Sequence, residues 1–351
     1  MTYSTSDKTR PNILITGGSG FLGSRIVEEF LDENCPIKVG LVRVIDCNPF
    51  KGKFIDQIEF IQADIRDFDA VVRACKDIDI VIHSAAIIDW GTKSEEEVLA
   101  VNVGGTENII KACHDNNIEN LVVTSSLDAV FTGKPLRNID ESQPYPESHH
   151  TVYCKSKKLT EIVSIKANNE DLKVVVLRPS DIYGENDPYH IDSLVDMAKT
   201  GFYVRLGNGR SKCQHVYVGN MAHAHILAAD ALWKGNIKVN GQVYFITDGE
   251  ASNFFKFFDQ IVAGAGYKIF PKNLWLPKGV AYTIATISEG IAFLARPFKR
   301  YNPKFSRFAV TYTCTDFTFT SDKAEEDFGF KAKYSLEEAI SKTTTWYKKK
   351  S

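Results

Sequence analysis

The stretch Thr16-Gly17-Gly18-Ser19-Gly20-Phe21-Leu22-Gly23 decides the fold of this chain. A predicted strand, Asn12–Thr16, precedes it, and the helix-compatible segment Ser24–Leu31 follows it. Its glycines have a G-x-x-G-x-x-G spacing, in which Gly17 permits a tight turn, Gly20 lets backbone approach a pyrophosphate, and Gly23 allows close helix packing. The N-terminus of the following helix would supply N–H groups and a partial positive charge to phosphates. The stretch therefore predicts a dinucleotide-binding turn.

Short apolar runs alternate with segments of helical period along the rest of the first half, which is typical of βαβ units. Two long helices are predicted over Glu95–Asn116 and Tyr153–Asn168. The further predicted strands are Lys38–Asp46, Ile58–Gln62, Ile78–His83, Asn120–Ser125 and Lys173–Arg178. Because these strands are almost entirely apolar, helices should cover both faces of the sheet. The predicted fold class is α/β, a Rossmann-type doubly wound parallel sheet.

The chain has 351 residues, which at about 150 residues per domain leaves room for a second unit. Residues 1–10 are polar and predict a flexible tail, and residues 11–183 form the predicted NAD(P)-binding domain. From residue 184 to 351 the elements are shorter and predict a smaller substrate-binding lobe. The late apolar run Gln242–Ile246 again predicts a sheet strand, so we expect the lobe to be interleaved with the first domain.

The acid at the end of the second predicted strand, Asp46, favours NAD. A carboxylate there can accept both ribose hydroxyls and would repel a 2′-phosphate. In a competing register the strand ends at Arg43, whose guanidinium could hold the 2′-phosphate of NADP. Asp64 follows the third strand and could reach the adenine amino group, although a capping or solvated carboxylate is the simpler interpretation of this residue alone. Ala85 and Ala86 follow the fourth strand, and their small side chains leave room for the nicotinamide ribose.

Tyr153 and Lys157 stand four residues apart at the start of a predicted helix and therefore share one face. Tyrosine ordinarily has a pKa near 10, and a nearby ammonium is expected to lower the pKa and suit the phenol to proton transfer. Ser125 and Ser126 end the fifth strand at the ligand side of the sheet, and only one can face the cleft. We prefer Ser126 as the group that hydrogen-bonds the substrate oxygen.

Composition excludes several other classes of protein. The formal net charge is -2, with 42 Lys and Arg against 44 Asp and Glu, which argues against nucleic-acid binding. The seven cysteines are odd in number and form no C-x-x-C pair, so they predict neither a disulfide framework nor a zinc site. His215, His223 and His225 are interpreted as capping or packing residues, and no metal is predicted. The polar N-terminus lacks a signal-peptide pattern, which predicts a reducing, cytoplasmic location.

These motifs together resemble the extended short-chain dehydrogenase/reductase family. The resemblance covers the whole chain and includes H-x-A-A at His83–Ala86, N-V-x-G-T at Asn102–Thr106, and Y-x-x-x-K at Tyr153–Lys157. Within that family the chain looks most like the 3β-hydroxysteroid dehydrogenase/isomerase branch, on the segments Leu177–Pro179, Ile182–Glu185, His215–His225 and Gln242–Asp248.

The resemblance implies a catalytic set of Ser126, Tyr153 and Lys157, with Asn102 in a structural and proton-relay role. It implies NAD(P) as hydride carrier, a 3β-hydroxysteroid, sterol or sterol-4-carboxylate as substrate, and a possible homodimer through the helix at Tyr153. The predicted cofactor-binding residues in total are Gly17, Gly20, Phe21, Leu22, Gly23, Asp46, Asp64, Ile65, Ala85, Ala86, Tyr153, Lys157 and Pro179.

An apolar helical stripe spans residues 280–294, at Val280, Ile284, Ile287, Ile291 and Leu294. The segment is too short and too charged to cross a bilayer. One hypothesis is an interfacial helix that contacts a membrane and collects apolar substrate there. The alternatives are a helix that covers the substrate cleft and a contact between subunits.

The sequence thus predicts an NAD-dependent oxidoreductase that interconverts a secondary alcohol and a ketone on a bulky apolar molecule, a 3β-hydroxysteroid or sterol. The alternative enzyme is an NADP-dependent reductase of a non-steroid ketone, which contact between Arg43 and the adenosine ribose would favour. The alternative outside enzymes is a cofactor-binding regulatory protein with a vestigial site. Loss of Tyr153 or Lys157 would have supported it, and both are present.

Overall fold

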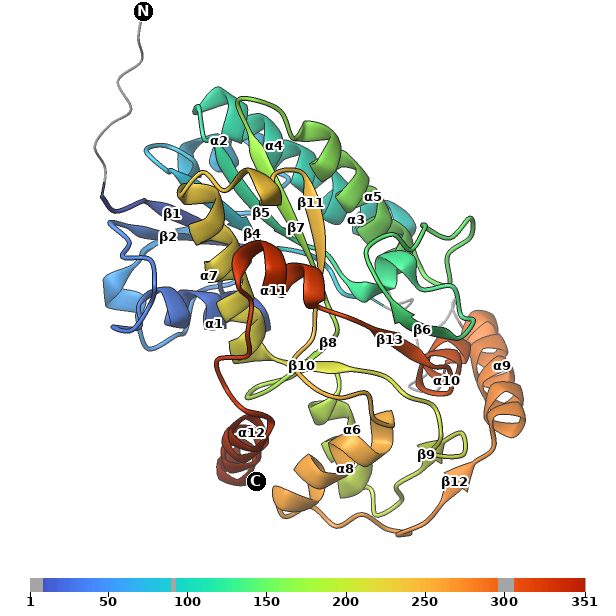
Figure 1. The fold of residues 1–351 in the computed structure, drawn as a ribbon. Helices are drawn as coiled ribbons and strands as arrows, with labels where there is room; N and C mark the ends of the chain where they lie inside the picture. The colour runs from blue at the N-terminus through green and yellow to red at the C-terminus, as the bar shows by residue number, and fades with distance from the viewer. Residues whose placement is uncertain (1–8, 90–92, 296–305, 351) are drawn as a thin grey trace, which may run out of the picture.

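A parallel seven-stranded sheet forms the centre of the molecule (Figure 1). The computed structural model describes residues 9–89, 93–295 and 306–350. The sheet order is β11-β7-β5-β4-β1-β2-β3, and every neighbouring pair is parallel. Its strands are β1 Ile13–Thr16, β2 Val42–Asp46, β3 Glu59–Gln62, β4 Ile80–His83, β5 Asn120–Thr124, β7 Lys173–Pro179 and β11 Gln242–Ile246. The predicted fold class is confirmed.

Helices cover both faces of the sheet, as the apolar strands require. In β1 the side chains alternate, since Ile13 and Ile15 pack in one core and Leu14 packs in the other. The first core lies under α1 (Phe21–Phe30), α7 (Val218–Trp233) and α11 (Asp322–Phe328), and the second lies under α2 (Phe68–Ala74), α4 (Gly105–Asp115) and α5 (Val152–Ala167). The sheet is therefore held between two apolar cores, one on each face, and the site lies at the ends of its strands.

The predicted elements are present with shifted ends. The predicted strand Lys38–Asp46 begins only at Val42, because the preceding segment forms a loop in which the N–H of Gly40 donates to the carbonyl of Pro11. The predicted helix Glu95–Asn116 is divided into α3 (Glu95–Leu99), a π-helical turn η2 (Ala100–Gly104) and α4. Such π-helical turns often occur at functional sites, and this one contains Asn102.

The second half of the chain returns to the sheet. Strand β11 pairs with β7, and α7 packs against α1 on the sheet face. Three two-stranded sheets join distant segments: β8 (Asp181–Tyr183) with β10 (His215–Tyr217), β9 (Arg205–Leu206) with β12 (Trp275–Leu276), and β6 (Leu136–Ile139) with β13 (Phe317–Phe319). The two halves therefore interleave, while the boundary at residues 183 and 184 stays a prediction. Most of the predicted tail, residues 1–8, lies outside the described residues.

A separate aromatic core holds the lobe together. Tyr183, Tyr203, Tyr217 and Phe258 are fully buried there. The helices around this core are α6 (Ile191–Lys199), α8 (Phe254–Gly264) and α12 (Leu336–Lys350), while α9 (Lys278–Ala295) and α10 (Arg307–Thr313) lie together at its edge (Figure 1). The single-turn helices are η1 (Ile55–Gln57), η3 (Leu127–Val130) and η4 (Ile237–Val239). The lobe thus faces the carboxyl ends of the sheet strands.

Candidate active site

A cavity of about 1090 Å³ runs from the glycine turn to α10 and is bounded by both halves of the chain. Its volume lies slightly above the range of about 300–1,000 Å³ that is typical of small-molecule sites. All thirteen predicted cofactor-binding residues line it, and so does Ser126. Among the predicted site residues, Asn102 alone is outside the lining.

The glycine turn has the geometry that a pyrophosphate needs. Gly17 has a φ of +72°, and a Cβ on it would come within 2.7 Å of the Ala85 backbone. A Cβ on Gly23 would lie 2.1 Å from the carbonyl oxygen of Gly17, which explains the close packing of helix and turn. Helix α1 begins beyond Gly20 with no capping side chain and no acid in its first turn. Its free N–H groups can therefore bind phosphate oxygens, and the residues fit a dinucleotide.

Asp46 lies at the carboxyl end of β2 and is buried at the cavity wall. Its two carboxylate oxygens accept the backbone N–H groups of Ser19, at 3.0 Å, and Asn48, at 2.8 Å. These bonds orient the carboxylate and leave each oxygen able to accept a ribose hydroxyl. The acid is thus placed as the NAD prediction requires.

The competing register at Arg43 is wrong. Arg43 lies inside β2, and its guanidinium donates to Glu59 and to the carbonyl oxygens of Ala74 and Lys76. Arg43 does not line the cavity. The observation that would have favoured an NADP-dependent reductase is therefore absent.

Asp64 and the loop after β4 form the rest of the cofactor wall. The carboxylate of Asp64 binds Arg66 through both oxygens, and these hydrogen bonds lower the pKa of Asp64 against a partial desolvation. The Ser84 hydroxyl donates to the carbonyl oxygen of Thr16 at 2.7 Å and fixes the loop that carries Ala85 and Ala86. Ala85 thus lies beside the glycine turn, and the room that the two alanines leave for the nicotinamide ribose stays a prediction.

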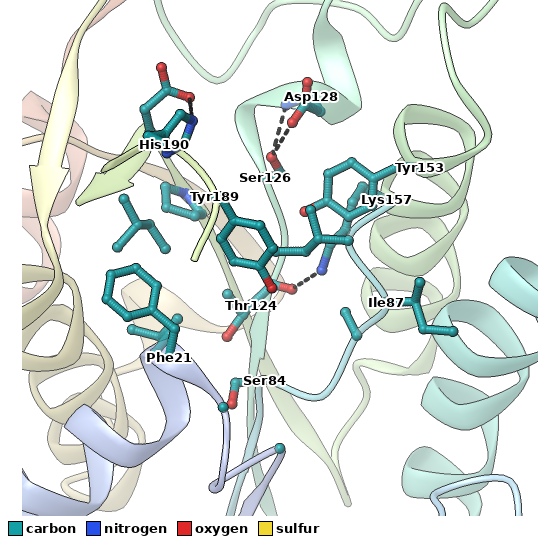
Figure 2. Close-up of a pocket in the computed structure, with 18 of the residues that line it drawn as sticks. Phe21, Ser84, Ile87, Thr124, Ser126, Asp128, Tyr153, Lys157, Tyr189 and His190 are labelled. Carbon is teal, nitrogen blue, oxygen red and sulfur yellow. Dashed lines mark hydrogen bonds and ion pairs between the residues drawn. The ribbon is translucent and has the colours of Figure 1, made fainter. Parts of the chain in front are cut away.

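Tyr153 and Lys157 project from the first turns of α5 into the cavity (Figure 2). Thr151 caps this helix by accepting the N–H of Cys154. The Lys157 ammonium donates to the carbonyl oxygen of Thr124 at 2.9 Å and lies 5.8 Å from the centre of the Tyr153 ring. Burial lowers the pKa of Lys157 to about 8, although the carboxylates of Glu161 and Asp128 oppose the shift.

The expected lowering of the pKa of Tyr153 is wrong for the protein itself. Burial raises the pKa of Tyr153 well above its ordinary value, and the neighbouring Asp128 carboxylate adds to the shift, while a hydrogen bond with Ser126 opposes it. The Y-x-x-x-K spacing indicates the nearby ammonium and does not indicate how deeply the lobe buries the phenol. Burial therefore favours the neutral phenol over the phenolate in the protein itself.

The two serines differ in what their hydroxyls bind. Ser125 donates to Glu161, a buried carboxylate that also forms an ion pair with Arg178. Ser126 donates to Oδ2 of Asp128 at 2.9 Å and accepts the Asp128 N–H at 3.1 Å (Figure 2). Because Ser126 also hydrogen-bonds Tyr153, it is the serine that adjoins the predicted base.

Asn102 holds the wall of the site and does not face the cavity. Its amide accepts the N–H of Ile87 at 2.7 Å and donates to the carbonyl oxygen of Ile87 and to Ser156. Its backbone carbonyl accepts the hydroxyls of Thr106 and Thr160. These bonds indicate a positioning role, and the proton-relay role stays a prediction.

A polar cluster at the far end of the cavity was missed by sequence reasoning. The glycine turn, marked by Phe21, lies at one end of the view in Figure 2, and Asp128 and His190 lie at the other. The cluster comprises Asp128, Asp181, Tyr189, His190 and Tyr312, which come from η3, β8, the loop before α6, and α10. These residues are far apart in the sequence, and no spacing rule joins them to one another.

His215 does not lie with His223 and His225. Its ring, Cys213 and Asp181 present ligand atoms within 4.8 Å of one another, since His215 pairs with Asp181 across β10 and β8. Burial raises the pKa of Cys213 well above its ordinary value, which disfavours the thiolate that a metal would need. His225 is buried and hydrogen-bonded to Thr124 and to the Met221 carbonyl, as a packing residue is. The absence of a metal stays a prediction.

Comparison with known proteins gives close agreement over most of the chain. The model of the 3-beta hydroxysteroid dehydrogenase/isomerase family matches residues 14–277. The decarboxylating sterol-4-alpha-carboxylate 3-dehydrogenase of Schizosaccharomyces pombe is 33% identical over 338 residues, covering 95% of this chain and 97% of that protein. Short-chain dehydrogenase/reductase family 42E member 1 of Homo sapiens is 34% identical over 361 residues, covering 97% of this chain and 88% of that protein.

Solved structures agree in fold. UDP-glucose 4-epimerase of Thermotoga maritima has a TM-score of 0.73 at 21% identity and covers 97% of this chain and 99% of its own. MoeE5, solved in complex with UDP-glucose and NAD, has a TM-score of 0.71 at 21% identity, with coverage of 97% and 99%. At this identity the similarity concerns the fold alone.

The glycine turn, the Tyr153–Lys157 pair and the sequence relatives together define a short-chain dehydrogenase/reductase, an oxidoreductase that acts on CH–OH groups. Within that class, the chain belongs to the 3-beta hydroxysteroid dehydrogenase/isomerase family. The predicted resemblance is confirmed at both levels.

Proposed function

We propose that this protein is an NAD-dependent dehydrogenase that interconverts a 3β-hydroxysteroid or sterol with its ketone. One observation carries the proposal: a single cavity joins the glycine turn and Asp46 to Ser126, Tyr153 and Lys157, and then continues into the lobe. The similarity to a protein named for sterol 3-dehydrogenase activity supports the substrate class.

The cofactor would bind with its pyrophosphate at the N-terminus of α1, its adenosine ribose at Asp46 and its nicotinamide near Ala86 and Pro179. NAD then supplies the hydride acceptor during alcohol oxidation. The protein would orient NAD through the glycine turn and through Lys157. The Lys157 ammonium lies 5.8 Å from the centre of the Tyr153 ring. Asp46 disfavours the 2′-phosphate of NADP.

The protein's own residues move the proton. Ser126 hydrogen-bonds the substrate oxygen and orients it, and the Tyr153 oxygen takes the hydroxyl proton during oxidation or returns it during reduction. Lys157 stabilises the phenolate, since its ammonium lies beside the ring. The burial of all three side chains excludes water from the reacting oxygen.

The lining beyond the catalytic set suits a bulky apolar molecule. Apolar side chains from five different parts of the chain meet there, from the loop after β4, α6, β9, α8 and α10; they are Ile87, Ile88, Met197, Leu206, Phe254, Phe255 and Phe308. A fused-ring sterol can cover these apolar side chains, while a small polar substrate would leave them in contact with water.

The test measures absorbance of reduced cofactor when purified protein, NAD or NADP, and a panel of 3β-hydroxysteroids, sterol acids and long-chain alcohols are mixed. We expect steroid-dependent reduction of NAD, with NADP much the poorer cofactor. Replacement of Tyr153 with Phe should abolish turnover and leave NAD binding nearly unchanged. Turnover retained in that variant, or cofactor binding without oxidation of any member of the panel, would favour a regulatory protein instead.

We further propose that α9 contacts a membrane surface. The apolar stripe predicted on this helix faces outward, with Ile287 59% and Leu294 74% exposed, while alanines such as Ala281 and Ala285 pack inward. Helix α10, which packs against α9, carries the cavity-lining residues Phe308 and Tyr312. An apolar substrate in a bilayer would therefore meet this edge of the cavity. None of the described helices is long and apolar enough to span a membrane.

A homodimer through α5 stays part of the proposal. Ile162 is 41% exposed on this helix, which suits a partly apolar contact. Sedimentation velocity of the protein with NAD would test it, and a monomer at micromolar concentration would contradict it.

A further inference from the structure

Two buried aspartates line the substrate end of the cavity. Asp128 and Asp181 are both buried there, and the Asp128 carboxylate lies 2.9 Å from the hydroxyl of Ser126 (Figure 2). Burial raises the pKa of Asp128 to about 6, against a hydrogen bond from Ser126 and with help from Asp181. At pH 7.5 the carboxylate is therefore still mainly ionised beside the predicted substrate oxygen.

His190, a cation of the same cluster, lies beside two other carboxylates. Its ring lies 3.7 Å from Asp181 and 3.6 Å from Asp187, and Asp187 in turn accepts backbone N–H groups at the start of α6. Burial lowers the pKa of His190, but these carboxylates outweigh it and raise the pKa to about 9. The His190 cation is thus shared among these carboxylates and Asp128, and its attraction for Asp128 is outweighed by burial, which keeps the pKa of Asp128 raised.

The other cations of the described lining are also engaged elsewhere. Lys157 donates to Thr124 beside Tyr153. Arg66 binds Asp64 near the adenosine end, and Lys93 binds Glu97. Within the part of the wall that the structure describes, an acidic group of a substrate placed next to Ser126 would meet the Asp128 carboxylate, while the cations nearby, His190 and Lys157, already interact with carboxylates of the protein itself.

We propose that Asp128 determines substrate specificity by excluding alcohols that carry a carboxylate on a carbon next to the reacting carbinol. The inference rests on the proposed function, because it assumes that Ser126 binds the carbinol oxygen. Covalent bonds hold both neighbouring carbons close to that oxygen, so an acid on either of them comes near the Asp128 carboxylate. Two like charges repel strongly when water is excluded.

A hydroxyl, a methyl group or hydrogen at the same carbon meets no such repulsion, and a hydroxyl could donate to Asp128. The preferred substrate class is therefore a neutral 3β-hydroxysteroid. In this respect the chain would differ from its Schizosaccharomyces pombe relative, which is named for a sterol carboxylate.

The experiment compares a neutral 3β-hydroxysteroid with the same steroid bearing a carboxyl group on the adjacent carbon. Reduced NAD is measured at pH 7.5 with wild-type protein and with the variants Asp128→Asn and Asp128→Glu. We expect wild-type kcat/KM to favour the neutral steroid by at least about tenfold. Asp128→Asn should reduce that ratio about tenfold, mainly through KM for the acid, and Asp128→Glu should retain it.

The ratio separates specificity from any general loss of activity, because a disturbed Ser126 would slow both steroids alike. Equal turnover of both steroids by the wild type, or an unchanged ratio in Asp128→Asn, would overturn the inference. The affinities of the two steroids for the protein saturated with reduced NAD, measured by calorimetry, give a second readout. If neither steroid is oxidised but the neutral one binds more tightly than the acid and Asp128→Asn loses that preference, the proposed function fails and the role of Asp128 in selecting the ligand stands. If neither binds, both proposals fail.

Discussion

Ser125 and Ser126 are consecutive, yet the Ser125 hydroxyl donates to the buried Glu161 carboxylate while the Ser126 hydroxyl donates to Asp128 in the cavity. The alternation of side chains at the end of β5 separates their roles. One serine supports the ion pair between Glu161 and Arg178, and the other adjoins Tyr153. This division makes the two residues a matched pair for mutagenesis.

Replacement of Ser126 with Ala should lower kcat for alcohol oxidation by about 10²-fold, because a positioned hydrogen bond to the reacting oxygen is lost. Ser125→Ala should leave kcat within a few-fold of wild type and lower the free energy of unfolding by about 1–2 kcal/mol, since Glu161 loses one buried partner. Steady-state kinetics and urea denaturation of both variants measure these effects. The reverse pattern, with Ser125 controlling kcat, would contradict the assignment.

Lys157→Met should weaken NAD binding and lower kcat together, because the ammonium is expected to contact both the cofactor ribose and the Tyr153 phenol. Tyr153→Phe should lower kcat by about 10³-fold or more and leave the dissociation constant of NAD within a few-fold of wild type. Fluorescence titration with reduced NAD and single-turnover kinetics separate binding from chemistry. Equal effects of the two variants on binding would argue against distinct roles.

The choice of cofactor should depend on Asp46 and not on Arg43. Asp46→Ala should raise KM for NAD about tenfold or more, because charge-assisted bonds to the ribose are worth about 1.5–3 kcal/mol, and it should improve the relative use of NADP. Arg43→Ala, the control on the same strand, removes contacts to Glu59, Ala74 and Lys76 and should leave the NAD to NADP ratio unchanged. A shift of that ratio in Arg43→Ala would restore the rejected register.

Much of the cofactor half could be predicted from the sequence because its signals are local. A glycine turn between a strand and a helix predicts a pyrophosphate site, and the end of the next strand predicts the position of Asp46. The Tyr153–Lys157 spacing is likewise a property of one helix. In each case the deciding residues are neighbours within one element or one turn, so the pattern alone places them.

The substrate half could be predicted less well because it is assembled from distant segments. Asp128, Asp181 and Tyr312 meet only after β8 and α10 fold against η3, and no periodicity in the sequence connects them. The orientation of α9 was open for a related reason: a helical stripe indicates one apolar face, but it does not indicate whether that face packs inward. Here the alanine face packs and the isoleucine face is exposed.

The exposed face of α9 predicts vesicle binding. The double variant Ile287→Ser and Ile291→Ser should reduce co-sedimentation with lipid vesicles at least fivefold, because burying each isoleucine would contribute about 1 kcal/mol or more. Ile237→Ser, which removes an exposed isoleucine from η4 and so from neither α5 nor α9, should bind like wild type. Wild-type protein that stays in the supernatant at low salt would contradict the membrane proposal. A dimer that the double variant loses would identify this face as a subunit contact instead.

Asp128 should also lower the stability of the protein above neutral pH. Its pKa in the folded protein is about 6, above the ordinary value of 3.8, so the folded state binds its proton more tightly than the unfolded chain does. As pH rises from about 4 to about 6, the folded state therefore loses the stability that came from its tighter proton binding, by up to roughly 3 kcal/mol at 1.36 kcal/mol per unit of pKa.

Asp128→Asn cannot ionise and should be more stable than wild type at pH 8, by about 1–3 kcal/mol, and should gain little at pH 4. Urea denaturation at both pH values measures the difference, and Asp140→Asn, at an exposed carboxylate, serves as control. A variant less stable than wild type at pH 8 would show that the bonds of Asp128 to Ser126 outweigh its desolvation. A gain would mean that the protein keeps a destabilising charge beside its substrate oxygen, as expected if that charge selects the substrate.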